Sequence, residues 1–188
     1  MRSYSKGGEK VTAKSYVLWF TGLSGAGKST LANEMHAIYQ AHGLNSYVLD
    51  GDRLRHSLNR DLGYTPKDRA ENIRRAGEVT KILTEAGVIV LAAFISPYKR
   101  DREMISQMFA AGTFIEVYVK CPLHICETRD PKGLYKLARA GTISNFTGIT
   151  SEYEAPEHPE LVVKADRMSI PACVDQIVAY LKQRGLLS

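Results

Sequence analysis

The sequence predicts an α/β fold with three layers (α/β/α), in which helices cover both faces of a mainly parallel five-stranded sheet. Short apolar runs rich in β-branched residues alternate along the chain with longer stretches at helical spacing. The runs are apolar almost throughout, as is typical of parallel strands buried on both faces. A length of 188 residues, of which 44% are hydrophobic, suits one domain with an ordinary core, and we expect it to span residues 15–188.

The expected elements follow one another as strand and helix in turn. The expected strands comprise residues 16–20, 46–49, 88–94, 114–119 and 161–164. The expected helices comprise residues 28–42, 66–86, 98–110, 122–129 and 171–184. The second helix has the clearest start, because Thr65 suits the N-cap, Pro66 the first helical position and Asp68 the first turn.

The loop after the first strand matches the phosphate-binding pattern G-x-x-x-x-G-K-[ST], the P-loop, and it reads Gly22-Leu23-Ser24-Gly25-Ala26-Gly27-Lys28-Ser29. A strand, a glycine loop and a helix N-terminus bind anions together, because unpaired backbone N–H groups and the helix dipole point at one spot. We therefore expect residues 22 to 30, through Thr30, to bind ATP, with Lys28 at the β- and γ-phosphates and the Ser29 hydroxyl on Mg²⁺. The alternative is a glycine-rich turn without a ligand. The motif and the alternation of strands and helices along the chain together predict a P-loop kinase fold.

Composition and charge argue against several other classes of function. The formal net charge is +5, but Lys and Arg are spread along the chain without a long basic run, so we expect no nucleic-acid partner. No apolar stretch approaches the roughly 20 residues that span a bilayer, so we expect no membrane segment. The first 14 residues are polar and basic, lack the apolar core of a signal peptide, and suggest a flexible tail. Three cysteines without a C-x-x-C pair fit a reducing cytoplasm better than a disulfide or zinc site.

Two carboxylates, Asp50 and Asp52, follow the second expected strand on either side of Gly51. Ligands of parallel α/β folds bind at the carboxyl ends of the strands, so we expect these side chains near the P-loop. There we assign Asp50, with Ser29, to Mg²⁺ and Asp52 to general-base chemistry. The alternative for either residue is a helix cap, because Asp is a favoured N-cap. The third expected strand has no acidic residue at its end, so the usual Walker B aspartate is absent there.

Six arginines lie between positions 53 and 75, and a planar guanidinium fork suits a phosphate or sulfate better than lysine does. Some of these arginines are expected to form helix-surface ion pairs instead. Arg69 and Asn72 are three apart, hence on one helical face, and Arg55 is a candidate to join them. Arginines around a site outside the P-loop indicate that the acceptor substrate is itself anionic.

Residues 129–153 combine basic side chains, aromatics and glycines, which is typical of a lid that closes over phosphates. Phe146 is a candidate to stack on a purine, and Lys132, Lys136 or Arg139 would neutralise charge on the transferred group. The alternative is an ordinary surface helix and loop, because basic helix faces are common. The D-x-x-G match that begins at Asp130 is interpreted as a coincidence, since no buried strand precedes it and no N-K-x-D is present.

Eight segments, in order over roughly residues 16–165, carry a resemblance to a known family. They read GLSGAGKST (22–30), DGD (50–52), DLGY (61–64), DRAENIRR (68–75), FISP (94–97), RDPKGLY (129–135), NFTG (145–148) and YEAP (153–156). On these segments the chain resembles adenylylsulfate kinase, also called APS kinase. The P-loop alone would be unspecific, whereas DRAENIRR, FISP and RDPKGLY are highly specific.

The resemblance implies a reaction and a set of site residues. ATP, with Mg²⁺, would phosphorylate the 3′-hydroxyl of adenosine 5′-phosphosulfate (APS) and give ADP and 3′-phosphoadenosine 5′-phosphosulfate, a step of sulfate activation. The implied APS-binding residues are Asp52, Arg55, Tyr64, Arg69, Asn72, Ile95, Ser96, Lys132 and Phe146. Asp52 is expected to orient and deprotonate the 3′-hydroxyl, and with Lys28 and Ser96 it forms the expected catalytic set.

Ser96 is open to two interpretations. The family has been described with a phosphoserine intermediate at this serine, whereas direct transfer needs only a hydroxyl that binds substrate. A covalent route requires a base beside Ser96, and the sequence shows no obvious one, so we favour direct transfer. Two positions depart from the family pattern: Tyr64 replaces a more usual Phe, and Thr150 replaces a common Asp. These changes bear on adenine packing and on one lid hydrogen bond.

Two other functions remain as alternatives. One is another small-molecule kinase of the P-loop class, of the nucleoside-monophosphate or shikimate type, against which the FISP and RDPKGLY segments speak. The other is a regulatory module that binds ATP without turnover, for which loss of Lys28 or Asp52 would be expected. The resemblance also suggests a homodimer, with ATP sulfurylase as a functional partner.

Overall fold

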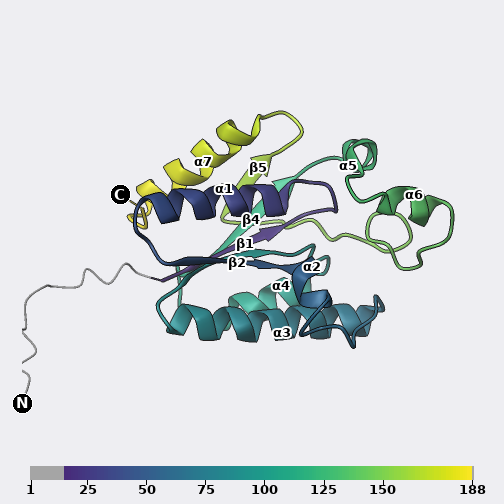
Figure 1. Cartoon of the computed structure of the whole chain (residues 1–188), viewed down its shortest axis with the longest axis horizontal. Coiled ribbons are helices and arrows are strands. Elements are labelled where there is room, and N and C mark those ends of the chain that lie inside the picture. The colour runs from purple at the N-terminus through teal and green to yellow at the C-terminus, as the bar shows by residue number, and fades with distance from the viewer. Residues whose placement is uncertain (1–14, 188) are drawn as a thin grey trace, which may run out of the picture.

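A fully parallel five-stranded sheet forms the centre of the computed structural model, which describes residues 15–187 (Figure 1). The strands are β1 (Val17–Thr21), β2 (Ser46–Asp50), β3 (Ile89–Ala93), β4 (Phe114–Lys120) and β5 (Leu161–Lys164). They are hydrogen-bonded in the order β2-β3-β1-β4-β5. All five expected strands are present, and no end is shifted by more than one residue. The tail expected for residues 1–14 lies outside the described residues.

Seven helices are present between residues 15 and 187. They are α1 (Lys28–Ala41), α2 (Gly51–Arg55), α3 (Pro66–Glu85), α4 (Lys99–Ser106), α5 (Leu123–Arg129), α6 (Leu134–Arg139) and α7 (Ile170–Gln183). The sequence did not predict α2 or α6 as separate elements, because each is too short to show a helical period. The expected end of α4 at 110 was wrong. Residues 108 and 109 form i→i+3 bonds to Ile105 and Ser106, which tighten the last turn and end the helix.

The helices cover both faces of the sheet and complete the three layers. Figure 1 shows α1 and α7 on one face and α3 and α4 on the other. Alternate side chains of β1 serve the two cores: Leu18 and Phe20 pack toward α1, whereas Val17 and Trp19 pack with the α3 side. A strand buried on both faces explains the nearly continuous apolar runs in the sequence.

Local signals start the longest helix as predicted. The Thr65 hydroxyl accepts a hydrogen bond from the Asp68 backbone N–H at 3.2 Å, and Pro66 occupies the first turn. This start fixes which residues of α3 face the sheet. Arg69, Asn72 and Ile73 are therefore buried against the rest of the domain.

The connections that leave β1, β2, β3 and β4 all emerge at the carboxyl edge of the sheet. They are the P-loop, α2, residues 94–97 and the segment that begins with α5. β1 lies beside β3 in the sheet. The connection after β1 leads to α1 on one face, whereas the connection after β3 leads to α4 on the other face (Figure 1). In parallel sheets a crevice opens where neighbouring connections lead to opposite faces. The fold thus brings four separate stretches of sequence to one site.

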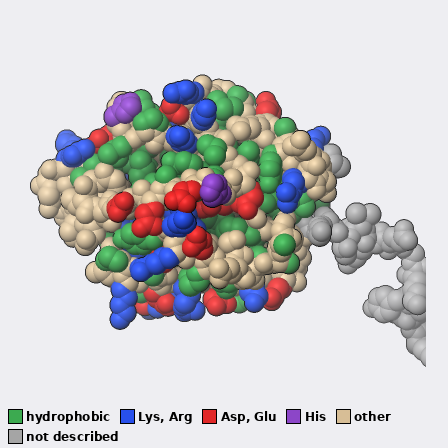
Figure 2. Space-filling model, turned by 180° about the vertical axis from the view of Figure 1, so that it is seen from behind, with side chains coloured by type: hydrophobic (Ala, Val, Ile, Leu, Met, Phe, Trp, Pro, Cys, Tyr) green, Lys and Arg blue, Asp and Glu red, His purple; other side chains and the backbone are tan. Residues whose placement is uncertain are grey.

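The outer surface carries charges of both signs. On the face shown in Figure 2, acidic side chains gather near the middle and surround basic ones and a histidine. Opposite charges at this spacing cancel within a few ångströms, so this face produces no extended field of one sign. Within residues 15–187, no helix has the length and apolar character needed to cross a membrane.

Candidate active site

The P-loop connects β1 to α1 through a backbone that only glycine adopts easily. Gly22, Gly25 and Gly27 have φ values of 151°, 73° and 106°. A Cβ on Gly22 would lie 2.6 Å from the Val119 carbonyl oxygen, so a side chain is also sterically excluded there. Gly27 is the N-cap of α1 and provides no side-chain cap, which leaves the first N–H groups of the helix available to an anion.

Lys28 is buried at the start of α1, and its ammonium group is bonded within the loop. Its Nζ donates to the carbonyl oxygens of Gly22 at 2.9 Å and Leu23 at 2.7 Å. Burial lowers the pKa of Lys28 to about 8, and the nearby Asp52 and Asp50 carboxylates oppose this shift. A buried cation of this kind is stabilised when a polyanion arrives, as expected of a phosphate-binding lysine.

Ser29 and Asp50 lie together at the N-terminus of α1. The Ser29 hydroxyl donates to Asp50 Oδ2 at 2.5 Å, while Asp50 Oδ1 accepts from the Asp52 backbone N–H at 2.9 Å. Asp50 is therefore both the N-cap of α2, as the alternative proposed, and a partner of the expected metal-binding hydroxyl. Oxygen atoms at this position fit Mg²⁺, which takes few protein ligands and completes its shell with phosphate oxygens and water. Within residues 15–187, no group of three His, Cys, Asp or Glu side chains is placed to hold a metal alone.

A cavity of about 460 Å³ extends from the P-loop to α3 and residues 131–147. All the acceptor-binding residues implied by the resemblance line it, namely Asp52, Arg55, Tyr64, Arg69, Asn72, Ile95, Ser96, Lys132 and Phe146. The P-loop residues that line it are Ser24, Gly25, Gly27, Lys28, Ser29 and Thr30. Gly22, Leu23 and Ala26 do not line the cavity, although two of them supply the carbonyl oxygens that hold Lys28. The structure thus brings the expected donor and acceptor residues to one cavity.

Asp52 and Lys132 form an ion pair across the mouth of this cavity. Asp52 belongs to α2, and Lys132 lies on the segment between α5 and α6, 80 residues further along the chain. Both side chains are more than half exposed, so water screens their attraction and the pair contributes little to stability. The Asp52 carboxylate is therefore free to exchange this partner for a substrate hydroxyl.

Two arginines and a tyrosine form the wall that α2 and α3 present to the cavity. Arg69 Nε donates to the Tyr64 carbonyl oxygen at 3.0 Å, and Arg69 Nη2 donates to the Asn145 carbonyl oxygen. The Arg55 guanidinium lies 4.3 Å from the centroid of the Tyr64 ring, so a cation covers one face of that ring. Burial lowers the pKa of Arg69, because desolvation disfavours its charge. An anionic ligand would offset the desolvation of the Arg69 charge.

Ser96 is buried in a strained turn after β3. Its φ is 39°, and its backbone carbonyl accepts from Arg102 Nη1 at 2.8 Å. Its hydroxyl accepts from Trp19 Nε1 at 3.1 Å and donates to Thr21 Oγ1 at 2.9 Å, and Thr21 in turn donates to the Ile95 carbonyl at 2.8 Å. Thr21 Oγ1 also lies 3.1 Å from the Tyr153 hydroxyl, whose pKa is raised by burial, so that it stays protonated. This chain of hydrogen bonds therefore ends at a carbonyl and a phenol and contains no base.

The segment expected to be a lid, residues 129–153, contains α6, and Asp130 fixes the start of this helix. Its carboxylate accepts from the backbone N–H groups of Tyr135 at 3.0 Å and Lys136 at 3.1 Å, and so caps α6. The two residues of the D-x-x-G match therefore have a local structural role, because Asp130 caps α6 and Gly133 is the residue just before its first turn. The Tyr135 hydroxyl donates to the Ser24 carbonyl at 2.9 Å and ties α6 to the P-loop, a contact that nothing in the sequence indicated.

Phe146 follows α6 in the same segment, and its side chain packs against that helix. Its ring meets Tyr135 edge to face, with centroids 5.0 Å apart, and remains at the cavity wall. The Phe146 backbone N–H donates to Thr150 Oγ1 at 2.9 Å, so Thr150, where the family commonly has Asp, still supplies an oxygen acceptor for this turn. Three basic residues were alternatives for neutralising charge on the transferred group, and they lie in different places. Lys132 lines the cavity, but Lys136 and Arg139 do not, and Arg139 pairs with Glu127 at 2.8 Å.

A P-loop that faces an arginine-lined acceptor cavity, on a parallel sheet of this order, defines a small-molecule kinase of the P-loop class. Residues 14–164 match the family model described as adenylylsulphate kinase. The chain belongs to the adenylylsulphate kinase family. It is therefore a phosphotransferase, with the ATP- and nucleotide-binding P-loop fold of that family.

Relatives cover nearly the whole chain. A probable adenylyl-sulfate kinase of Bacillus subtilis is 55% identical over 93% of this chain and 87% of its own length. The adenylyl-sulfate kinase of Marinobacter nauticus is 53% identical over the same shares. The structure of the Mycobacterium tuberculosis APS kinase in complex with AMPPNP and APS superimposes with a TM-score of 0.86 at 44% identity, covering 90% of this chain and 98% of that one.

Proposed function

We propose that this chain transfers the γ-phosphoryl group of Mg-ATP to the 3′-hydroxyl of APS. The observation that carries the proposal is the single cavity that joins the P-loop to the acceptor residues named above. The Mycobacterium tuberculosis relative, which was solved with an ATP analogue and APS, supports the same pair of substrates. The reaction belongs to sulfate activation.

The P-loop half of the cavity binds the donor. The triphosphate lies against the N–H groups of residues 22–30, and Lys28 exchanges its two carbonyl partners for β- and γ-phosphate oxygens. Ser29 and Asp50 would hold Mg²⁺, which would neutralise charge on the phosphates. These contacts fix the γ-phosphorus at the junction with the acceptor half.

The other half of the cavity binds APS. Arg55, Arg69 and Asn72 provide donors for its anionic end, and the rings of Tyr64 and Phe146 provide apolar surface for the adenine. Ile95 and Ser96 form the floor next to β3. Cationic donors beside aromatic rings distinguish a nucleotide with an anionic 5′ group from a sugar or a plain nucleoside.

Asp52 stands between the two halves and acts on the ribose 3′-hydroxyl. As substrates bind, the hydroxyl replaces Lys132 as the partner of the Asp52 carboxylate. The 3′-oxygen forms its bond to the γ-phosphorus while the bond from that phosphorus to the bridging oxygen of ADP breaks. The hydroxyl proton passes to Asp52, and the freed Lys132 ammonium faces the transferred group.

Ser96 binds substrate in this proposal and is not a nucleophile. Its hydroxyl already donates to Thr21 and accepts from Trp19, and neither partner can take up a proton at neutral pH. A phosphoserine route would need a base in this place. Direct transfer needs none, because Asp52 supplies it at the other end of the acceptor.

The test is ADP release from Mg-ATP with APS as acceptor, compared with AMP and with no acceptor. We expect ADP formation that depends on APS and collapses in Asp52→Ala. Asp175→Ala is the matched control, because Asp175 is exposed on α7, away from the cavity. Turnover with AMP alone would contradict the acceptor assignment. Tight ATP binding without turnover would support the regulatory module instead.

We further propose a homodimer that works in the cytoplasm beside an ATP sulfurylase. Cys121, Cys126 and Cys173 are all free and buried, which suits a reducing compartment. A related APS kinase of Thiobacillus denitrificans is hexameric, so assembly occurs among relatives. Light scattering on a sizing column would measure the mass of the assembly, and a monomer would contradict the proposed dimer.

A further inference from the structure

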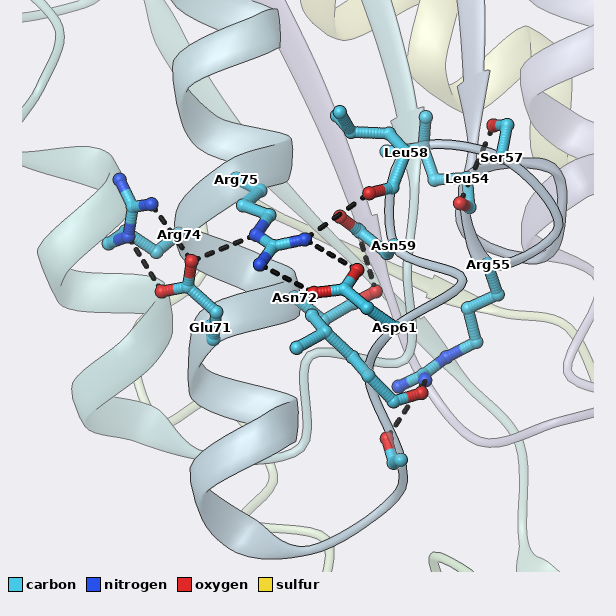
Figure 3. A network of polar contacts seen from close by, with 12 residues as sticks. Leu54, Arg55, Ser57, Leu58, Asn59, Asp61, Glu71, Asn72, Arg74 and Arg75 are labelled. Atoms are coloured by element: carbon cyan, nitrogen blue, oxygen red, sulfur yellow. Dashed lines mark hydrogen bonds and ion pairs between the residues drawn. The ribbon is translucent and has the colours of Figure 1, made fainter.

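Asn59 is fully buried in the loop between α2 and α3, behind the wall of the acceptor cavity. It does not line the cavity, and no sequence motif indicated a role for it. Its amide Nδ2 donates to Asn72 Oδ1 at 2.9 Å, as Figure 3 shows. Two asparagine amides are thus joined, and one of them, Asn72, lines the cavity.

The hydrogen bond from Asn59 occupies the oxygen of the Asn72 amide. The Asn72 oxygen is engaged by Asn59, whereas Asn72 Nδ2 has no hydrogen-bond acceptor among residues 15–187. The NH₂ group therefore remains for a ligand, beside the guanidinium groups of Arg55 and Arg69. With the amide reversed, a carbonyl oxygen would stand there and repel an anion.

Asn59 is held in place from several sides. Its backbone N–H donates to the Leu54 carbonyl at 2.8 Å, and its own carbonyl accepts from Leu62 at 3.1 Å. Arg75, one turn after Asn72 on α3, donates to the Leu58 carbonyl at 3.2 Å and to both carboxylate oxygens of Asp61 (Figure 3). The loop is thus fastened to the helix that carries Asn72, so the two amides cannot drift apart.

One atom in this arrangement remains without a partner. Asn59 Oδ1 is buried and has no hydrogen-bond partner among the described residues. Unpaired buried polar atoms are rare because they reduce stability, and each requires an explanation. A leucine of similar size would fill the space without that cost, so packing alone does not explain an asparagine here.

We propose that Asn59 is a positioning residue that holds the Asn72 amide with its NH₂ group toward the acceptor cavity. The α3 wall then presents only donors to the anionic end of the acceptor. The inference rests on the proposed function, because only an anionic acceptor requires donors at this position.

A double-mutant cycle on acceptor binding tests the proposal. We expect Asn72→Ala to raise the KM for APS about 10- to 100-fold, as for loss of a hydrogen bond to a charged group. Asn59→Ala should raise it about 3- to 10-fold through loss of orientation, with the KM for ATP unchanged. The double variant should match Asn72→Ala alone, because Asn59 acts through Asn72. If the double variant instead raises the KM for APS by the product of the two single effects, the proposal is overturned.

The controls separate orientation from folding. Leu58→Ala is the matched variant, because Leu58 is exposed in the same loop and uses only its backbone carbonyl. It should leave the KM for APS unchanged. Asn59→Asp should raise this KM more than Asn59→Ala does, since a carboxylate accepts from Asn72 and turns its oxygen to the cavity. An equal or smaller rise would contradict the proposal.

A measurement on the unmodified protein covers the case in which these variants do not fold. In amide NMR spectra, the Asn59 NH₂ signals should exchange slowly with solvent, and the Asn72 NH₂ signals should shift when APS is added. The reverse pattern would show the amides turned the other way and refute the inference. Absence of APS-dependent ADP formation by the unmodified protein would refute the proposed function itself, so the two failures are distinguishable.

Discussion

The donor and acceptor halves of the cavity are built in opposite ways. The donor half is mostly one continuous stretch, residues 22–30, which is shaped by its own glycines and by the start of α1, and Asp50 is joined to it through Ser29. The acceptor half is assembled from α2, α3, the turn after β3 and the lid, which are far apart in the sequence. The first half therefore depends mainly on residues that are neighbours in the sequence, whereas the second exists only when the whole domain is packed.

The cationic side chains of the two halves also have different kinds of partner. In the donor half, the buried Lys28 is satisfied by carbonyls of its own loop. In the acceptor half, Arg69 spans from Tyr64 to Asn145, and Lys132 reaches Asp52. Ligand recognition by the acceptor half is therefore coupled to its structure, because the same cations join its parts. Substitutions in the two halves should thus have different signatures.

The largest effect is expected where the halves meet. Asp52→Asn should lower kcat about 10²- to 10⁴-fold, because the amide cannot accept the 3′-hydroxyl proton, while the KM for ATP stays within about twofold. Initial rates of ADP release at saturating substrates measure this change, with Asp175→Asn as the control. A loss below about tenfold would assign the base to another group.

The next effect should be confined to the donor half. Lys28→Met should lower the rate about 10²- to 10³-fold, because a preorganised cation at the γ-phosphate is lost. APS binding should persist, since no acceptor residue depends on Lys28. Calorimetric titration with APS checks this, and loss of APS affinity in this variant would contradict the independence of the two halves.

A substitution in the acceptor half should affect both binding and stability. Arg69→Lys should raise the KM for APS about 10- to 100-fold, because an ammonium cannot reach Tyr64, Asn145 and the ligand together. It should also reduce the free energy of unfolding by about 1–3 kcal/mol, since a buried fork loses its partners. Denaturant titration and kinetics measure the two effects, and Arg167→Lys, at an exposed position, is the control. A rise in the KM for APS without a loss of stability would show that ligand recognition by Arg69 does not depend on its structural bonds.

The smallest effect compares two basic lid residues. Lys132→Ala should lower kcat about tenfold, less than a buried cation would, because water screens it. Arg139→Ala should change kcat by less than about twofold, since its partner is the surface carboxylate of Glu127. Equal losses in the two variants would show that the lid acts through its overall charge and not through Lys132.

The sequence was informative wherever neighbouring residues make the structure. The P-loop, the five strands and the Thr65 cap were predicted, because each depends on backbone preferences within a few residues. The family resemblance added the acceptor residues, all of which line the cavity. The sequence could not decide between Lys132, Lys136 and Arg139, because nothing near Arg139 in the sequence reveals that it pairs with Glu127.

What the sequence determined by itself is the P-loop of the donor half, in which Lys28 bonds to residues six and five positions away. Only the tertiary structure decided the acceptor half, where the bond from Arg69 spans 76 positions and that from Lys132 spans 80. It also decided the place of Asn59, which touches the site only through Asn72. The physical reason is that short-range contacts are set by local geometry, whereas long-range contacts exist only after the sheet has brought its loops to one edge.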